Sequence, residues 1–184
     1  FLAMLVMLAS SWALHRATAA NAERSFRAMH LVSSAMYSTS HGLNDAQKTM
    51  GIIAVLLYST GYLQGEFEVP HWVAISCYLA IAAGTMTGGW KIIETMGSRI
   101  TKLSQHQGFS ASIAGSAVVF TASTLGIPVS TAHTITGSII GSGVARRASS
   151  VRWGVARRVV TAWVITIPAS AAVGAMFYFL TRLF

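Results

Sequence analysis

The stretch HGLNDAQKTMGIIAVLLY, residues 41–58, decides the fold prediction. An apolar run follows directly on four polar side chains: Asn44, Asp45, Gln47 and Lys48. A charge at the centre of a membrane helix costs about 3 kcal/mol, so such groups usually face a partner or a cavity. Asp45 either pairs with Lys48 on the same helical face, or lies with Asn44 at a helix break where their oxygens bind a small cation. The sequence leaves both interpretations open.

The composition is that of an all-α polytopic membrane protein. The chain is 53% hydrophobic and 10% charged, whereas soluble domains carry about 25% charged residues. Lys and Arg number 13 against five acidic residues. The arginines flank apolar spans and form no basic face with interleaved aromatics, so we expect no nucleic-acid partner. The single Cys77 has no disulfide partner and no metal-site spacing, so we expect a buried small hydrophobe.

The apolar runs predict one transmembrane domain over residues 1–184, since a membrane helix needs about 20 apolar residues. The chain begins at Phe1 inside an apolar segment, which suggests part of a longer protein. A polar connector (16–30) and an acidic loop (64–70) separate the first spans. The expected segments are the end of a span (1–15), a broken span interrupted at Gly42 (31–63), a span (71–97), a re-entrant helical hairpin (107–143) and a last span (159–181).

The hairpin prediction comes from two short helical stretches on either side of LGIPVS (125–130). Non-helical backbone at membrane depth survives only against protein or a water-filled cavity. If the hairpin returns to its own side, the three basic connectors (16–30, 98–106 and 143–158) share one face, which the positive-inside rule places in the cytoplasm. Ten basic residues lie in these connectors: Arg16, Arg24, Arg27, Arg99, Lys102, Arg146, Arg147, Arg152, Arg157 and Arg158.

The hairpin tip GIPVSTAHT (126–134) predicts an anion site. Ser130 is a good N-cap for the second half-helix, and Thr131 and Thr134 add hydroxyls in its first turn. A helix N-terminus offers free N–H groups and a positive dipole end to an anionic substrate. Capping alone would explain Ser130 equally well, and the two roles are compatible.

The sequence supports other functions less well. Ser130 and His133 lie three residues apart, as in an intramembrane Ser-His hydrolase, but no third group is evident to orient His133. We therefore expect no enzyme. A channel-like or structural subunit would lack saturable, gradient-dependent uptake.

His41 lies beside the Asn44–Asp45 pair and could exchange protons near pH ~6.5. Lys91 and Glu94, one turn apart, predict a local ion pair.

The motifs resemble one known family. HGLNDAQKTMGII (41–53), GTMTGGWKIIETMGSRI (84–100) and GIPVSTAHTITGSIIG (126–141), in this order, are similar to the second half of a PiT-type inorganic phosphate transporter. The resemblance runs from about residue 22 to the C-terminus. It implies a symporter of two inverted repeats that holds phosphate between them and couples uptake to Na⁺ or H⁺. It implies no further cofactor and no resident metal.

The resemblance also implies the site. Phosphate would contact Ser130, Thr131, Asn44 and Asp45, and the cation and coupling residues would be Asp45, Asn44, Gln47, Lys48 and Thr134. A transporter for another oxyanion, such as sulfate, is the alternative.

Two departures from the family pattern stand out. The first repeat is missing, and Ser112 occupies a position where relatives often carry Glu. The expected partners are phosphate, free or as a metal–phosphate complex, the lipid bilayer of the inner or plasma membrane, the missing N-terminal repeat and a second copy in a homodimer.

Overall fold

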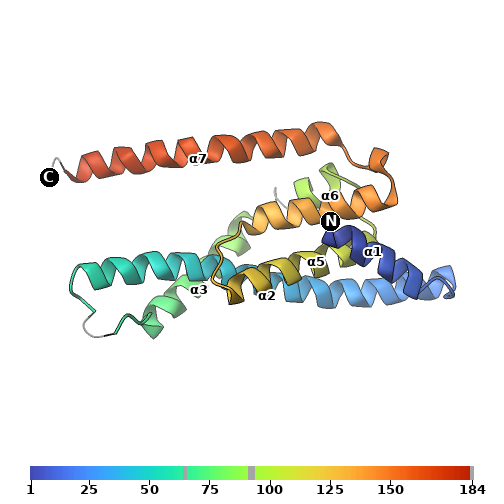
Figure 1. Ribbon diagram of the computed structural model, residues 1–184, viewed down its shortest axis with the longest axis horizontal. Coiled ribbons are helices and arrows are strands. Elements are labelled where there is room, and N and C mark those ends of the chain that lie inside the picture. Colours follow the sequence, from blue (N-terminus) through green and yellow to red (C-terminus); the bar gives the residue numbers. More distant parts are fainter. Residues whose placement is uncertain (64–65, 91–93, 183–184) are drawn as a thin grey trace.

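The computed structural model describes residues 1–63, 66–90 and 94–182, which contain helices and no strand (Figure 1). This confirms the all-α prediction. The longer elements are α1 (Leu2–Ala13), α2 (Ala19–Ser59), α3 (His71–Gly88), α5 (Gln105–Thr124), α6 (Thr131–Arg146) and α7 (Trp153–Thr181). A π-helix, η1 (Thr95–Arg99), and a 3-10 helix, η2 (Ala148–Ser150), lie in the connectors.

Helix α2 is continuous, so the predicted break at Gly42 is wrong. The helix has 41 residues and also takes in most of the connector expected at 16–30. A helical glycine costs only about 1 kcal/mol relative to alanine, and α2 contains no proline. The packing of α2 on α3 and α5 outweighs that cost. Asn44 and Asp45 therefore lie within a regular helix.

Helix α3 is shorter than predicted. It ends at Gly88, where two successive glycines hold a helix poorly. The single helix expected over 71–97 is therefore interrupted after Gly88, and Thr95–Arg99 form the π-helix η1. Lys91, one partner of the predicted ion pair, lies outside the described residues. Glu94 accepts a 2.8 Å bond from the Nη2 of Arg99.

Helices α5 and α6 form a hairpin broken where the sequence predicted. At the start of α5, the Ser104 Oγ accepts from the Gln107 N–H and the Gln107 side chain accepts from the Ser104 N–H, which is a capping box. Gly126, with φ of +69°, follows the last turn of α5 in the left-handed region that glycine favours. Pro128 comes next, and α6 begins after Ser130.

Two small clusters form the apolar core. Ala46 and Met50 of α2 pack on Val73 and Cys77 of α3, which confirms Cys77 as a buried hydrophobe. The second cluster joins the hairpin to the connectors that flank it, through Ile100, Ala111, Ile139 and Val151. The hairpin is thereby fixed at its base, and α5 runs along α2 (Figure 1).

The connectors predicted to be basic meet at one end of the molecule. The Arg152 N–H donates to the Ile100 carbonyl at 2.9 Å, and His30 bonds Gln105 at 2.8 Å. The loop after α2 lies at the opposite end (Figure 1). Helix α7 runs beside α6 (Figure 1) and meets it where Trp163 lies against His133. Among the described residues it alone is long and apolar enough by length and composition to cross a membrane.

Candidate functional site

Asp45 is the centre of the site, because three side chains converge on its carboxylate. The Lys48 Nζ lies 3.1 Å from Oδ1, and the Thr131 Oγ1 donates to Oδ2 at 3.2 Å. The Nδ1 of His41 is 3.4 Å from Oδ2 without hydrogen-bond geometry. The Asp45 side chain keeps 34% of its surface exposed, so the carboxylate remains accessible while its partners fix its position.

Lys48 ties this centre to the hairpin break. Its ammonium also donates to the Val129 carbonyl at 2.6 Å. One of the two interpretations left open by the sequence placed Asp45 at a helix break, where backbone carbonyl oxygens are free. The freed carbonyl belongs instead to the hairpin, since α2 is continuous. The two motifs of the sequence thus meet at one place, 81 residues apart in the chain.

Asn44 supplies a buried amide on the other side of Lys48. Its Nδ2 donates to the Ser123 Oγ at 2.8 Å, and the residue is 3% exposed. Within the described part of the chain its Oδ1 has no hydrogen-bond partner. Buried polar atoms are normally satisfied, so this oxygen is an exception among the described residues. A cavity of about 260 Å³ is lined by Asn44, Gln47, Lys48, Ser123, Gly126, Ile127 and Pro128.

The first turn of α6 is built as the sequence predicted. The Ser130 Oγ accepts from the His133 N–H at 3.3 Å, and the Thr134 Oγ1 donates to the Ser130 carbonyl at 3.0 Å. Thr131 is buried, and its carbonyl accepts from the Tyr37 hydroxyl at 3.0 Å. The helix end that faces α2 is therefore both capped and held in place.

The structure gathers the predicted residues unevenly. Asn44, Lys48 and Thr131 lie around or next to Asp45, and Gln47 lines the adjoining cavity. Ser130 and Thr134 belong to the same α6 turn, but their hydrogen bonds stay within that turn.

The imidazole of His133 lies against Trp163, with ring centroids 3.9 Å apart. The Ser130 hydroxyl bonds the backbone of His133 and not its ring. Ser130 and His133 therefore do not form the side-chain pair that a Ser-His hydrolase would need.

Sequence reasoning missed Tyr37, Ser123 and the Val129 carbonyl. Tyr37 lies eight residues before Asp45, which is close to two helical turns and hence the same face. Ser123 lies in the last turn of the first half-helix, opposite Asn44. The sequence signal that could have identified Tyr37 and Ser123 is that both are polar residues lying shortly before a motif.

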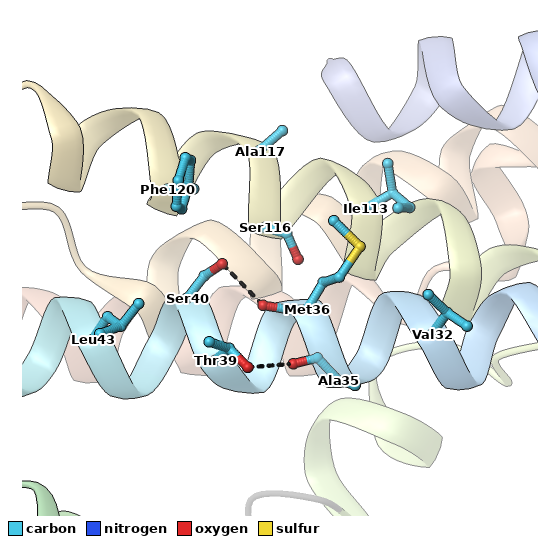
Figure 2. Close-up of a pocket in the computed structure, with 10 residues that line it drawn as sticks. All are labelled: Val32, Ala35, Met36, Thr39, Ser40, Leu43, Ile113, Ser116, Ala117 and Phe120. Atoms are coloured by element: carbon cyan, nitrogen blue, oxygen red, sulfur yellow. Dashed lines mark hydrogen bonds between the residues drawn. The ribbon is translucent and has the colours of Figure 1, made fainter.

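An apolar groove of about 660 Å³ runs between α2 and α5 (Figure 2). Two of its hydroxyls are used within their own helix α2: Ser40 donates to the Met36 carbonyl and Thr39 donates to the Ala35 carbonyl. The remaining lining is mainly aliphatic, with Phe120 at one end. The groove suits a hydrophobic neighbour and not phosphate. Ser112, where the resemblance led us to expect Glu, is buried in α5.

A polar Asp–Lys–Thr centre at a hairpin break, in an apolar helical chain, is typical of membrane transport proteins. The sequence model of the Phosphate transporter family matches residues 2–174. The chain therefore belongs to that family, as its motifs predicted, and is a membrane protein.

Individual relatives agree. The chain is 58% identical over 178 residues to a probable low-affinity inorganic phosphate transporter of Rhizobium meliloti, covering 97% of this chain and 53% of the relative. For the Bacillus subtilis protein of the same description the identity is 42%, with 89% and 49% covered. The chain spans about half the length of these curated relatives.

A solved structure described as the sodium-dependent phosphate transporter superposes with a TM-score of 0.78 at 32% identity. The match covers 89% of this chain and 41% of that one. The relatives and this structure are transporters and not enzymes, which confirms the prediction that the chain belongs to no enzyme class.

Proposed function

We propose that this chain forms one half of a secondary transporter that carries inorganic phosphate across the membrane together with Na⁺ or H⁺. The observation that supports this most is the contact of Asp45 with Thr131 at the hairpin tip. It joins an acidic group, suited to a cation, to a helix N-terminus, suited to an oxyanion. The names of the relatives supply phosphate as the oxyanion.

Each predicted residue has a role in this proposal. Phosphate would be held by the N–H groups and hydroxyls of Ser130 and Thr131, where the α6 dipole is positive. Asn44 and Asp45 would complete the phosphate site from α2 and also serve the cation. Gln47, Lys48 and Thr134 would complete the cation and coupling site around them.

The rest of the transporter would come from outside this chain. We infer that the hairpin is re-entrant and that the chain is one of two inverted repeats, with the other repeat covering the Asp45 site. The shared end of the basic connectors would face the cytoplasm of a cell whose inner or plasma membrane holds the protein. The protein would bind free phosphate or a metal–phosphate complex, and two copies would form a homodimer.

The test is labelled-phosphate uptake by cells that express the full-length protein, with Asp45→Asn beside wild type in Na⁺ and Na⁺-free buffers. We expect saturable uptake that Asp45→Asn abolishes while the protein stays in the membrane. Glu68→Gln, which removes an exposed acid from the loop at the far end, is the control and should transport normally.

Unlabelled sulfate decides the substrate, since strong competition would favour the broader oxyanion transporter. Full activity in Asp45→Asn would overturn the role of this carboxylate.

A further inference from the structure

Lys48 places its ammonium where a bound cation would lie. The Nζ is 3.1 Å from an oxygen of the Asp45 carboxylate and 2.6 Å from the Val129 carbonyl. A carboxylate from one element and a freed carbonyl from another are the ligand types that hard cations take in proteins. The lysine thus places its positive charge between two oxygen ligands, the Asp45 carboxylate and the Val129 carbonyl. We call this position the Asp45 seat.

We propose that Lys48 is a built-in cation that excludes Na⁺ from the Asp45 seat, so that phosphate uptake by this protein does not use Na⁺ there. The inference rests on the proposed function and names the ion that its coupling site rejects. The sequence left two roles open for Asp45, pairing with Lys48 and binding a cation. In this proposal Asp45 pairs with Lys48 and so holds the hairpin in place without a metal ion.

The competition between Lys48 and Na⁺ favours the lysine for two reasons. A tethered group faces its site at a high effective concentration, whereas a free ion must be captured from solution. Displacement would also leave a partly buried ammonium without its two oxygen partners, and an unpaired buried charge is costly. The Val129 bond matters here, because Na⁺ would have to break it and so loosen the hairpin break.

The neighbourhood contains no second candidate for this role. Among the described Lys, Arg and His side chains, only Lys48 and His41 bring a nitrogen within 4 Å of the Asp45 carboxylate, and the imidazole of His41 is not in hydrogen-bond geometry. The hairpin faces Asp45 with the hydroxyl of Thr131. On the α3 side, α2 packs against apolar residues and Cys77.

A vacant seat would remain suited to Na⁺. The Lys48 ammonium contacts two oxygens, one of the Asp45 carboxylate and one of the Val129 carbonyl. Removal of the ammonium would leave both oxygens available to another cation. A neutral residue at position 48 should therefore create a Na⁺ site where wild type has none.

The experiment measures radiolabelled Na⁺ binding to the purified full-length protein, and phosphate uptake in proteoliposomes with and without Na⁺. We compare wild type, Lys48→Gln, Lys48→Arg and the control Lys102→Gln, which removes an exposed lysine at the basic end. We expect Na⁺ binding in Lys48→Gln alone. If that variant transports, we expect Na⁺ to stimulate its uptake by about fivefold or more, the lower end of typical coupling between two ligands.

The two readouts separate this inference from the proposed function. Wild-type uptake that requires Na⁺, with Na⁺ bound to wild type and lost in Asp45→Asn, overturns the inference and leaves phosphate transport intact. Absence of phosphate uptake by wild type overturns the proposed function. The Na⁺-binding measurement still tests whether Lys48 excludes Na⁺ from the Asp45 seat. Equal Na⁺ binding by wild type and Lys48→Gln overturns the inference. If Lys48→Gln does not fold, the wild-type measurement and Lys48→Ala decide.

Discussion

The hydroxyl of Tyr37 donates a 3.0 Å hydrogen bond to the Thr131 carbonyl, which joins residues 94 positions apart. The ring of Tyr37 also lies close to Gly115 of α5, where an added Cβ would come within 3.0 Å of Cε2. One side chain of α2 therefore contacts both half-helices of the hairpin.

Tyr37→Phe should keep the ring packing and remove this bond. We expect the free energy of unfolding to fall by about 1 kcal/mol, the usual value of a hydrogen bond, and the KM for phosphate to rise because the α6 tip is held less firmly. Thermal denaturation in detergent and uptake kinetics measure the two effects. The control is Tyr58→Phe at the end of α2, whose hydroxyl has no hydrogen bond within the described ranges. Identical melting and KM in Tyr37→Phe would contradict the prediction.

Thr131→Val should weaken phosphate binding. It removes the hydroxyl that donates to Asp45 at 3.2 Å and keeps the side chain's shape. Under the proposed function the same hydroxyl also contacts phosphate, and bonds to charged groups are worth about 1.5–3 kcal/mol, so we expect phosphate affinity to fall about tenfold or more in equilibrium binding. Thr131→Ser should restore most of it. Thr166→Val, which removes a hydroxyl bonded within α7, is the control, and an equal loss there would point to general damage.

Ser123→Ala should destabilise the protein more than a typical exposed substitution. The Asn44 Nδ2 would lose its 2.8 Å acceptor while remaining buried, at a cost of about 1–3 kcal/mol. Denaturation of the purified protein gives the value. Thr124→Ala removes an exposed hydroxyl one residue later and should change stability by less than about 0.5 kcal/mol. Equal effects of the two changes would show that the Asn44 bond contributes little.

Gly108→Ala should disrupt the contact of α5 with α2. A Cβ at this position would clash with the His30 ring, so the imidazole must move and give up its bond to Gln105. Overpacking of this kind costs about 1–3 kcal/mol.

Gly137→Ala in α6 meets nothing within 4 Å and should be neutral or stabilising by up to about 1 kcal/mol. The sign of the difference in melting temperature between the two variants is the test, and a stable Gly108→Ala would contradict the close contact.

The sequence allowed the all-α class, the hairpin and its break to be predicted, because local chemistry determines them. Gly126 and Pro128 end one helix, and Ser130 begins the next. The course of α2 could not be predicted, because a single glycine is a weak signal and the packing of α3 and α5 against the helix outweighs it.

The site was predicted in its residues but not in its geometry. Asp45 and Thr131 each belong to a recognisable motif, while their contact is a long-range consequence of packing. The bond from Lys48 to the Val129 carbonyl could not be found from residue types, because any residue at position 129 has that carbonyl.

Helix α2 has a mechanical consequence that follows from its length. Its 41 residues span about 60 Å, twice the roughly 30 Å of a bilayer's hydrocarbon core. Its first turns, with Arg24 and Arg27, must then stand in water or among lipid headgroups while Asp45 lies about 40 Å along the rod. The helix is continuous and contains no proline, the commonest cause of a kink. The helix should therefore tilt as one rigid body. A tilt of its first turns at the aqueous surface then also displaces the Asp45 carboxylate at the hairpin tip.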